Sequence, residues 1–335
     1  MTMTTRTTRV SIIGDGGWGT TLAVLLAGKG CAVTLWGAFP AYIETMRRCR
    51  VNKKFLPGIT IPRHVVLTAD LAAAVASSEV IVLAVPSQYL TATLRKIKKL
   101  DYAGRVFVSV VKGIDTGTLL TMSQLIGKEL GKVKVAVLSG PTIAIEVAKK
   151  IPTTAVSSSR DVLLARRVQA LFSCPAFRVY TNPDILGVEL CGSVKNVIAL
   201  ACGICDGLGF GTNTKAAGLT RGLVEMTRLG KTLGADPRTF MGLAGLGDLA
   251  TTCFSPNSRN RHVGYELGKG RKIKDILATM DAVAEGVVTA KAVHQWARRL
   301  KIEMPITAAV YQVIYNNKNA KEIVSGLMGR ALKSE

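Results

Sequence analysis

Three glycines near the start of the chain have the spacing of a turn that holds the pyrophosphate of a dinucleotide. They are Gly14, Gly16 and Gly19, in a G-x-G-x-x-G pattern. The first glycine permits the tight turn, the second lets the backbone approach the phosphates, and the third allows close helix packing. The pattern follows an apolar run and opens a helical stretch that continues to about Lys29, which is the context the fingerprint requires. We therefore predict a dinucleotide site at this turn, with the N–H groups of the helix N-terminus facing the phosphates.

The segment after this helix bears on the choice of coenzyme. A site for NAD usually has a carboxylate about 20 residues beyond the first glycine, where it binds the ribose hydroxyls. Residues 34–38 read TLWGA here, without an acid, so NADPH is permitted as well as NADH, and we predict a slight preference for NADPH. Its 2′-phosphate would need a basic partner, and the candidates are Arg47, Arg48 and Arg50.

Lys195 is the candidate proton donor for a reduction. Hydride addition to a ketone builds negative charge on the oxygen, so the site needs a cationic acid aimed at that atom. We place Lys195 at the start of a long helix in which Gly192, Asn196, Ala199 and Gly203 form a stripe of small residues, beside which a ligand could lie. A surface lysine is the alternative, but the adjoining asparagine and the apolar flanks favour a site.

Two strand ends in the first half supply further polar groups. Lys112 follows an apolar run at 106–111, at the carboxyl edge where open α/β sheets bind ligands, and could touch both cofactor and substrate. Gly140 to Thr142 follow another strand and begin a helix, so they offer backbone N–H groups and a hydroxyl to an anion. A simple helix cap at Thr142 is the alternative, and the two roles are compatible.

Asp248 follows a glycine-rich turn in the second half. An aspartate there could orient Lys195 or bind a substrate hydroxyl, and a turn-forming aspartate is the alternative.

Ser258, Arg259 and Asn260 are predicted to bind a substrate phosphate. Asn257 and Ser258 look like the caps of a helix that ends near Gly268, which puts Arg259 and Asn260 in its first turn. Capping explains the serine and the asparagine. It does not explain Arg259, because a cation at a helix N-terminus opposes the dipole by about 0.3–1 kcal/mol unless an anion is bound there. Arg259 could also reach the cofactor.

The elements that must position these residues form two groups. In the first half short apolar runs alternate with helical stretches, which predicts a parallel sheet with crossover helices. The runs are 10–14, 32–36, 80–85, 106–111 and 133–138, and we expect 154–157 and 177–180 to extend the sheet. From about Asp184 the spacing becomes helical, at 185–206, 215–233, 288–300 and 307–315. We predict an α/β fold, with a Rossmann-type dinucleotide-binding domain at 1–188 followed by an all-helical substrate domain at 189–335.

Charge and composition narrow the class of ligand. Lysine and arginine number 44 against 22 acids, a formal net charge of +22 that is spread along the 335 residues. Such a field attracts phosphorylated ligands and could bind nucleic acid without specificity. No recognised nucleic-acid motif accompanies the charge, so we expect no specific nucleic-acid partner.

Cysteine usage and hydropathy indicate a soluble intracellular protein without a metal. The seven cysteines are odd in number, and the one C-x-x-C, Cys202 to Cys205, lies in an apolar helical run, so we interpret the pair as buried thiols rather than metal ligands. The apolar run within residues 1–13 is too short for a signal peptide, and residues 197–205 are too short for a membrane span. We predict a cytoplasmic protein without a membrane span, and expect a homodimer.

Taken together, the motifs of both halves resemble those of the bacterial NAD(P)H-dependent glycerol-3-phosphate dehydrogenases. The resemblance covers nearly the whole chain and ends with LMGR at 327–330. The motifs that carry it are GDGGWG at 14–19, FLPG at 55–58, AVPSQ at 84–88, KG at 112–113, SGP at 139–141, GVEL at 187–190, VKNVIA at 194–199, GLAGLGDL at 242–249 and SPNSRN at 255–260.

The resemblance implies an activity and assigns roles to residues. It implies the reversible reduction of dihydroxyacetone phosphate to sn-glycerol 3-phosphate with NADPH or NADH, in support of phospholipid synthesis, without a metal. Lys195 in its V-K-N-V motif is implied as the acid and base. The implied substrate contacts are Lys112, Gly140, Thr142, Lys195, Asn196, Asp248, Ser258, Arg259 and Asn260. The implied cofactor contacts are Gly14, Gly16, Gly17, Trp18, Gly19, Ala38, Lys112, Ala144, Arg259, Val283 and Glu285.

The chain departs from the family pattern at a few positions. The family often has a basic residue where Ala38 stands, and a serine or alanine where Asp15 and Gly17 stand. Ala38 therefore removes an expected contact to a 2′-phosphate, and Asp15 adds a negative charge near the pyrophosphate turn. Thr142 replaces a more common serine and keeps the hydroxyl. The rival hypotheses are a related reductase, acting on a 3-hydroxy acid or ketopantoate, and a noncatalytic dinucleotide sensor or basic nucleic-acid-binding protein.

Overall fold

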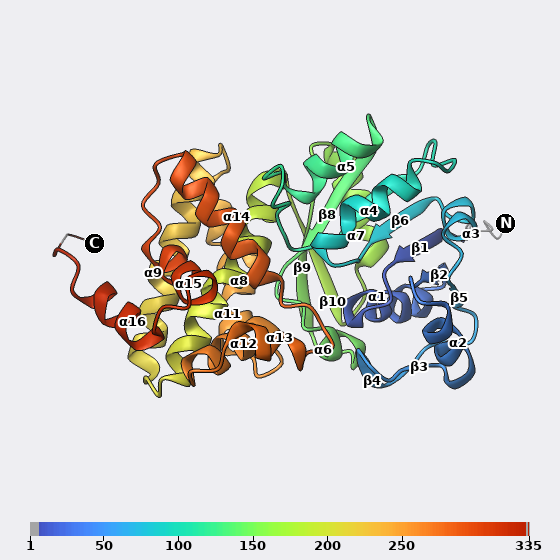
Figure 1. The fold of residues 1–335 in the computed structure, drawn as a ribbon. Coiled ribbons are helices and arrows are strands. Elements are labelled where there is room, and N and C mark those ends of the chain that lie inside the picture. Colours follow the sequence, from blue (N-terminus) through green and yellow to red (C-terminus); the bar gives the residue numbers. More distant parts are fainter. Residues whose placement is uncertain (1–6, 333, 335) are drawn as a thin grey trace. The chain divides into compact units, whose positions relative to one another are not determined.

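The computed structural model describes residues 7–332 and 334, and the chain forms two compact units (Figure 1). Unit 1 consists of the chain up to Lys112 and of Thr121–Ile185, and unit 2 of Gly113–Leu120 and Leu186–Glu335. The chain thus enters unit 2 briefly at 113–120, which the sequence pattern did not indicate. The observed division at 185/186 lies close to the predicted boundary at 188.

Unit 1 is built on an eight-stranded sheet with the order β10-β9-β8-β7-β6-β1-β2-β5. The middle of this order, β8-β7-β6-β1-β2-β5, has the strand order of a Rossmann fold, and the order reverses between β1 and β6, where ligands bind at the carboxyl ends. In register, Val10 of β1 lies between Val33 of β2 and Val80 of β6. The strands are β1 Arg9–Ile13, β2 Ala32–Trp36, β5 Val66–Thr68, β6 Val80–Leu83, β7 Val106–Ser109, β8 Lys134–Ser139, β9 Thr153–Ser158 and β10 Phe177–Asn182.

The predicted strands are all present, but the sheet is not wholly parallel. β9 pairs antiparallel with β8, while β10 pairs parallel with β9. The parallel sheet predicted from the five runs up to 138 is confirmed by the pairs β1–β2, β1–β6, β6–β7 and β7–β8. No direction was predicted for 154–157, because a run of apolar residues gives none. The sequence analysis also missed β5 and a small antiparallel hairpin, β3 (Val51–Asn52) with β4 (Leu56–Thr60). These strands are short and lack a sustained alternation.

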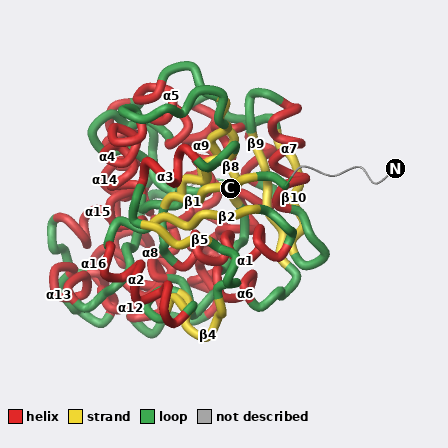
Figure 2. The backbone as a smooth tube through the Cα atoms, turned by 90° about the vertical axis from the view of Figure 1, so that its right-hand side faces the viewer, coloured by secondary structure: helices red, strands yellow, loops and turns green. Residues whose placement is uncertain are grey.

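Helices cover the sheet of unit 1, and Figure 2 shows α1 beside the neighbouring strands β1 and β2. Side chains facing these helices, such as Ile12, Leu35 and Val108, are fully buried. Several helices begin at sequence-encoded caps: Asp70 and Asp161 each accept two backbone N–H groups, which satisfies donors that the first turn leaves unpaired. The helices are α1 Gly17–Gly28, α2 Pro40–Cys49, α3 Leu71–Ala76, α4 Ser87–Ile97, α5 Met122–Leu130, α6 Ala144–Ala148 and α7 Val162–Phe172.

Unit 2 is helical, as predicted, and α8 and α12 cross at close range. A Cβ atom on Gly203 would lie 2.1 Å from the carbonyl oxygen of Arg261, and one on Gly264 would lie 2.1 Å from that of Leu200. The Gly203 end of the predicted small-residue stripe therefore packs against helix backbone rather than a ligand. The helices are α8 Ile185–Gly207, α9 Thr212–Thr232, α10 Pro237–Phe240, α11 Asp248–Phe254, α12 Arg259–Gly268, α13 Ile273–Ala278, α14 Glu285–Arg299, α15 Pro305–Tyr315 and α16 Ala320–Met328.

Helix α8 is longer than the apolar run from which the absence of a membrane span was predicted. It has 23 residues, which by length and composition would suffice to cross a membrane. Of its most apolar window, 83% is buried inside the protein, as in a core helix, and it carries the buried polar residues Glu189, Lys195 and Asn196. The absence of a membrane span stays a prediction. The N-terminal residues 1–6, part of the segment judged too short for a signal peptide, lie outside the described residues.

Candidate active site

The glycine-rich turn of unit 1 has the form of a dinucleotide cradle. Gly14 has φ +126°, and a Cβ there would lie 2.6 Å from the carbonyl carbon of Ala84 in the loop after β6. Gly19 packs against Gly14, since its Cβ would lie 2.0 Å from the Gly14 oxygen. At Gly16, by contrast, a Cβ would have no atom within 4 Å. Protein packing therefore explains two of the glycines, while Gly16 leaves open the space where a pyrophosphate would approach.

The start of α1 is suited to an anion. Its N-cap, Gly16, has no side chain to cap the helix, and no acid lies in its first turn, so the first N–H groups and the positive end of the dipole are available to a phosphate. Gly17 lies against the β3–β4 hairpin, where a Cβ would come within 2.6 Å of the Phe55 oxygen. It also lies near Ala144 on α6. The ring of Trp18 packs against Phe177 in the core, so a cofactor contact by Trp18 would use its backbone.

Three of the predicted substrate residues meet in unit 1. The ammonium of Lys112 donates to the carbonyl oxygen of Gly140 at 2.8 Å, and the hydroxyl of Thr142 donates to the same oxygen at 3.1 Å. Helix α6 begins at Ala144, with Ile143 as its N-cap. The alternative that Thr142 caps this helix was therefore wrong, because Ile143 lies between Thr142 and the first helical residue.

The arginines proposed to meet a 2′-phosphate are engaged elsewhere. Arg47 and Arg48 both pair with Glu44 on α2, at 2.6 and 3.1 Å. Arg50 donates to the backbone oxygens of Ile61, Pro62 and Val65. Helical spacing explains the first two pairs, since residues three and four apart on a helix are neighbours. Ala38 itself is exposed and offers no charge.

Unit 2 holds a buried polar cluster around Lys195. The Lys195 Nζ lies 3.1 Å from Oδ1 of Asp248 and 2.5 Å from the hydroxyl of Thr252. That hydroxyl also donates to the carbonyl oxygen of Asp248 at 2.7 Å. Side-chain exposure is 7% for Lys195 and 2% for Asp248, so the two charges compensate each other where water cannot. The structure thus places Asp248 against Lys195, and its predicted role in orienting the lysine stays a prediction.

The positions of Lys195 and Asp248 in their helices differ from those that the sequence analysis gave. Lys195 lies in the middle of α8 (Ile185–Gly207) rather than at its start, because the helix begins before the apolar run. Leu243–Gly247 forms one π-helical turn instead of a glycine turn, and Asp248 is the first residue of α11. Such turns often occur at functional sites. Gly245 allows this one, since a Cβ there would lie 2.0 Å from the Phe240 oxygen.

Asn196 and Asn260 link three helices beside this cluster. The Asn260 amide nitrogen donates to Asn196 Oδ1 at 2.8 Å, and Asn260 Oδ1 accepts from the backbone N–H of Gly286 at 2.9 Å. Both side chains are buried. The two asparagines therefore fix α8, α12 and the start of α14 relative to one another, a structural role beside the substrate contact that the sequence analysis assigned to them.

The start of α12 is as predicted, with Ser258 as its N-cap. The Ser258 hydroxyl accepts the backbone N–H of Arg261 at 3.2 Å, so capping accounts for this side chain. Arg259 is exposed and donates to the carbonyl oxygen of Val283 at 2.9 Å. Desolvation lowers the pKa of Arg259, and the charge of Glu285 opposes this lowering. The structure thus brings together Arg259, Val283 and Glu285, which the sequence analysis assigned to the cofactor.

Two polar residues of these clusters were missed from the sequence. Thr252 is one helical turn after Asp248, and that i, i+4 spacing would have identified it. Asn52 in β3 is fully buried and donates to the backbone oxygen of Asp15 at 2.7 Å and to the Thr20 hydroxyl at 2.8 Å. Nothing in its local sequence marks it, because its partners are 32 and 37 residues away.

The C-x-x-C pair lies on α8, where Cys202 is buried and Cys205 is partly buried. Burial raises the pKa of Cys205 to about 11, so this thiol is protonated at neutral pH and is a poor metal ligand or nucleophile.

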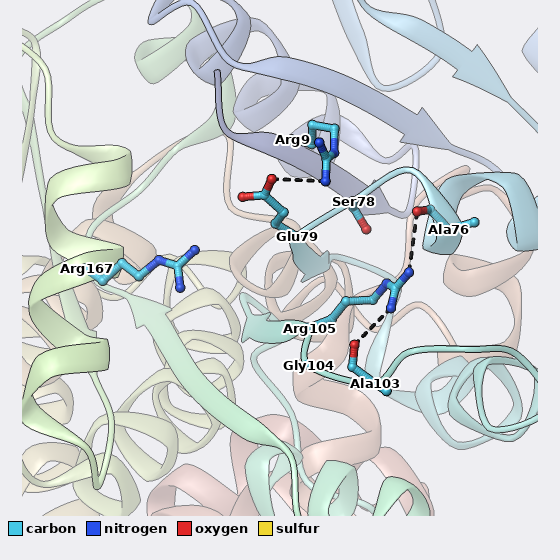
Figure 3. Close-up of a pocket in the computed structure, with 8 residues that line it drawn as sticks. All are labelled: Arg9, Ala76, Ser78, Glu79, Ala103, Gly104, Arg105 and Arg167. Atoms are coloured by element: carbon cyan, nitrogen blue, oxygen red, sulfur yellow. Dashed lines mark hydrogen bonds and ion pairs between the residues drawn. The ribbon is translucent and has the colours of Figure 1, made fainter. Parts of the chain in front are cut away.

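A separate depression of about 310 Å³ lies at the amino ends of strands in the unit 1 sheet, away from their carboxyl ends (Figure 3). Arg9, Glu79 and Arg105, which line it, stand at or just before the amino ends of β1, β6 and β7. Arg9 pairs with Glu79 at 3.1 Å, and Arg105 donates to the backbone oxygens of Val75 and Ala103. None of the predicted site residues lines this depression.

Comparisons with known proteins cover both units. The family patterns described as NAD-dependent glycerol-3-phosphate dehydrogenase N-terminus and C-terminus match residues 9–165 and 184–325. The chain is 50% identical to a glycerol-3-phosphate dehydrogenase [NAD(P)+] of Geobacter sulfurreducens over 98% of each chain, and 49% identical to that of Chlorobium limicola over 97% of this chain and 99% of the other. The crystal structure of glycerol-3-phosphate dehydrogenase from Coxiella burnetii matches with a TM-score of 0.94 at 37% identity, covering 97% of this chain and 99% of that one.

Proposed function

The chain belongs to the NAD-dependent glycerol-3-phosphate dehydrogenase family and reduces dihydroxyacetone phosphate to sn-glycerol 3-phosphate with NADH or NADPH, and we propose that Lys195 protonates the new alkoxide. The observation that supports this role is the buried contact of Lys195 with Asp248 and Thr252. A cation held in a site with little water stabilises negative charge on a substrate oxygen far more than an exposed one does. The same residue would remove the hydroxyl proton in the reverse direction.

Asp248 and Thr252 position the ammonium of Lys195. The Asp248 carboxylate compensates its charge, and the Thr252 hydroxyl accepts one of its three N–H bonds. An ammonium has three donors, and we propose that Lys195 turns one of them to the substrate oxygen when the substrate binds. Proton donation by a side chain held in this way contributes about 10²–10⁴-fold to a rate.

The substrate phosphate is assigned to the start of α12. Ser258, Arg259 and Asn260 stand there, and the positive end of the helix dipole adds to the charge of Arg259. Asn196, next to Lys195, completes the set in unit 2. We also propose Lys112, Gly140 and Thr142 of unit 1 as substrate contacts, because Lys112 follows β7 and Gly140–Thr142 follow β8, at the carboxyl edge of the sheet.

The residues present in unit 1 fit a nicotinamide dinucleotide. The coenzyme, when bound, supplies the hydride and accepts it back in the reverse reaction. Gly14, Gly16 and Gly19 would admit its pyrophosphate to the start of α1, where a Cβ on Gly16 would have no atom within 4 Å. Gly17, Trp18, Ala38, Lys112 and Ala144 are the further proposed contacts in unit 1, and Arg259, Val283 and Glu285 those in unit 2.

The proposal extends to organisation and setting. We assign dinucleotide binding to residues 1–188 and substrate binding to 189–335. The proposal includes a role in supplying phospholipid synthesis, a cytoplasmic location and a homodimer. It includes neither a membrane span nor a specific nucleic-acid partner.

The direct test follows the loss of absorbance at 340 nm with purified protein, NADH or NADPH, and dihydroxyacetone phosphate. We expect oxidation that depends on this substrate and is absent with ketopantoate or a 3-keto acid. Oxidation with those compounds instead would favour the related reductases. Folded protein that binds coenzyme but oxidises it with none of them would favour the noncatalytic sensor.

A further inference from the structure

The carboxylate of Asp15 lies at the end of the second strand, although Asp15 belongs to the turn after the first. A Cβ atom on Gly37 would lie 2.5 Å from both Cγ and Oδ2 of Asp15. Gly37 directly follows β2 (Ala32–Trp36), where NAD sites carry the acid that binds the adenosine ribose. Residues 34–38 contain no acid, so the structure brings one to this place from another part of the sequence.

This carboxylate has an unused acceptor. Oδ2 of Asp15 is buried and has no hydrogen-bond partner among the described residues. Desolvation raises the pKa of Asp15, and a hydrogen bond from its own backbone N–H opposes this. A buried acceptor without a donor destabilises the protein. Asp15 is itself partly exposed, so a ligand hydroxyl arriving at the turn could supply the missing donor after a small rotation of the side chain.

The backbone of Asp15 is held in place by the β3–β4 hairpin. The side-chain amide of Asn52 donates to its carbonyl oxygen, and the hydroxyl of Thr20 approaches the same oxygen at 3.3 Å. Asn52 is fixed in turn by the hydroxyl of Tyr42, which donates to its Oδ1 at 2.7 Å. The charge of Asp15 is therefore kept at the turn by contacts that involve no ligand.

The arginines of α2 and its C-cap, and Lys54 of the β3–β4 hairpin, are engaged with groups other than the Asp15 carboxylate. Arg47 and Arg48 pair with Glu44, and Arg50 is bound to three backbone oxygens. Ala38, where a base would meet a 2′-phosphate, is uncharged. The ammonium of Lys54 lies over the Phe55 ring at 5.4 Å. A second phosphate on the ribose would therefore meet a negative charge and none of these arginines.

We infer that Asp15 is the residue that selects the coenzyme: it binds the adenosine ribose hydroxyls of NADH and repels the 2′-phosphate of NADPH. This inference rests on the proposed function for the identity of the ligand. It replaces the slight preference for NADPH that the sequence alone suggested. The two expectations differ because the second strand carries no acid at residues 34–38, whereas Asp15 comes from the glycine turn.

The test measures binding without catalysis. Isothermal titration of the wild-type protein with ADP-ribose and with 2′-phospho-ADP-ribose gives the ratio of their dissociation constants, which we expect to favour ADP-ribose by at least about tenfold at low salt. Asp15→Asn keeps the shape and removes the charge, so the ratio should fall by about tenfold. Raising the ionic strength should reduce the discrimination of the wild type more than that of the variant. Asp15→Ser, which the family tolerates at this position, is the second variant if the asparagine protein does not fold.

The control is Asp101→Asn, which removes one negative charge from the loop before β7, at the opposite edge of the sheet. Its ratio should equal that of the wild type. Ala38→Arg, combined with Asp15→Ser, should bring the ratio below one.

Two results would overturn the inference. The first is a wild-type ratio of dissociation constants near one. The second is an equal loss of affinity for both ligands in the Asp15 variants, which would mean that the side chain only fills space beside Gly37. Failure of the proposed function would give a different result. The titrations would still favour ADP-ribose over 2′-phospho-ADP-ribose, but dihydroxyacetone phosphate would not oxidise the coenzyme.

Discussion

The glycine turn of unit 1 and the Lys195 cluster of unit 2 are built in opposite ways. The turn is formed by backbone, and its glycines matter because they lack side chains: Gly14 and Gly19 let segments touch, and Gly16 leaves space. The cluster works through side chains, with Lys195, Asp248 and Thr252 buried and paired. A site made of backbone is damaged by adding atoms, whereas a site made of paired side chains is damaged by removing them.

The largest effect should come from removing the cation of the cluster. Lys195→Ala is expected to lower kcat by about 10³-fold or more, because the proton donor is lost, and to reduce the free energy of unfolding by about 3 kcal/mol, because the buried charge of Asp248 loses its cation. Steady-state assays at 340 nm and urea unfolding measure the two effects. Lys231→Ala, an exposed lysine on α9, is the control and should change neither. Substantial turnover by Lys195→Ala would exclude the mechanism.

Adding a single methyl group should damage the turn nearly as much. Gly16→Ala should fold normally, since its φ of −63° suits alanine and no atom lies within 4 Å of the new Cβ. It should weaken ADP-ribose binding by about 10–100-fold because the methyl group occupies the path of the pyrophosphate. Gly19→Ala should instead lower Tm, since its Cβ meets the Gly14 oxygen. Unchanged binding by Gly16→Ala would mean that the dinucleotide does not lie over this glycine.

A smaller effect should separate positioning from charge within the cluster. Thr252→Val keeps shape and volume but removes the hydroxyl that Lys195 donates to, so kcat should fall by about tenfold, with KM little changed. Thr252→Ser should restore most of the activity. Thr251→Val changes the preceding residue on the same helix and is the matched control. If the valine variant loses stability but keeps kcat, Thr252 has only a structural role.

The smallest effect concerns Glu225, a buried carboxylate of unit 2 outside the cluster. It accepts the backbone N–H groups of Ile306 and Thr307 at the start of α15. Desolvation raises its pKa above the usual 4.5, and these hydrogen bonds oppose the rise. The folded state therefore binds the proton more tightly, so the stability that Glu225 contributes is full below pH 4.5 and falls as pH rises through the folded pKa.

Glu225→Gln should remove this dependence. Urea unfolding at pH 5 and pH 7.5 should show a loss of stability in the wild type that is smaller in the variant, by about 1 kcal/mol or less. Glu44→Gln is the control: its hydrogen bond to Arg48 lowers the pKa of Glu44, so its contribution has the opposite sign. An unchanged pH dependence in Glu225→Gln would show that Glu225 is not the group responsible.

The sequence by itself determined much of this protein. The spacing of Gly14, Gly16 and Gly19, the alternation of apolar runs with helices, and the later change to helical spacing gave the fold class and most element bounds, because these are local patterns with a fixed period. The cap of α12 at Ser258 and the candidacy of Lys195 and Asp248 also followed from local sequence.

Tertiary structure decided what depends on contacts between distant residues. The antiparallel pairing of β9, the contact of Thr252 with Lys195 and the clamp of Asn52 on Asp15 join segments whose spacing along the chain carries no signal. The clearest case is Asp15. Its position in the sequence puts it at the pyrophosphate turn, but its side chain lies against Gly37 at the end of β2, since adjacent parallel strands bring their carboxyl ends together.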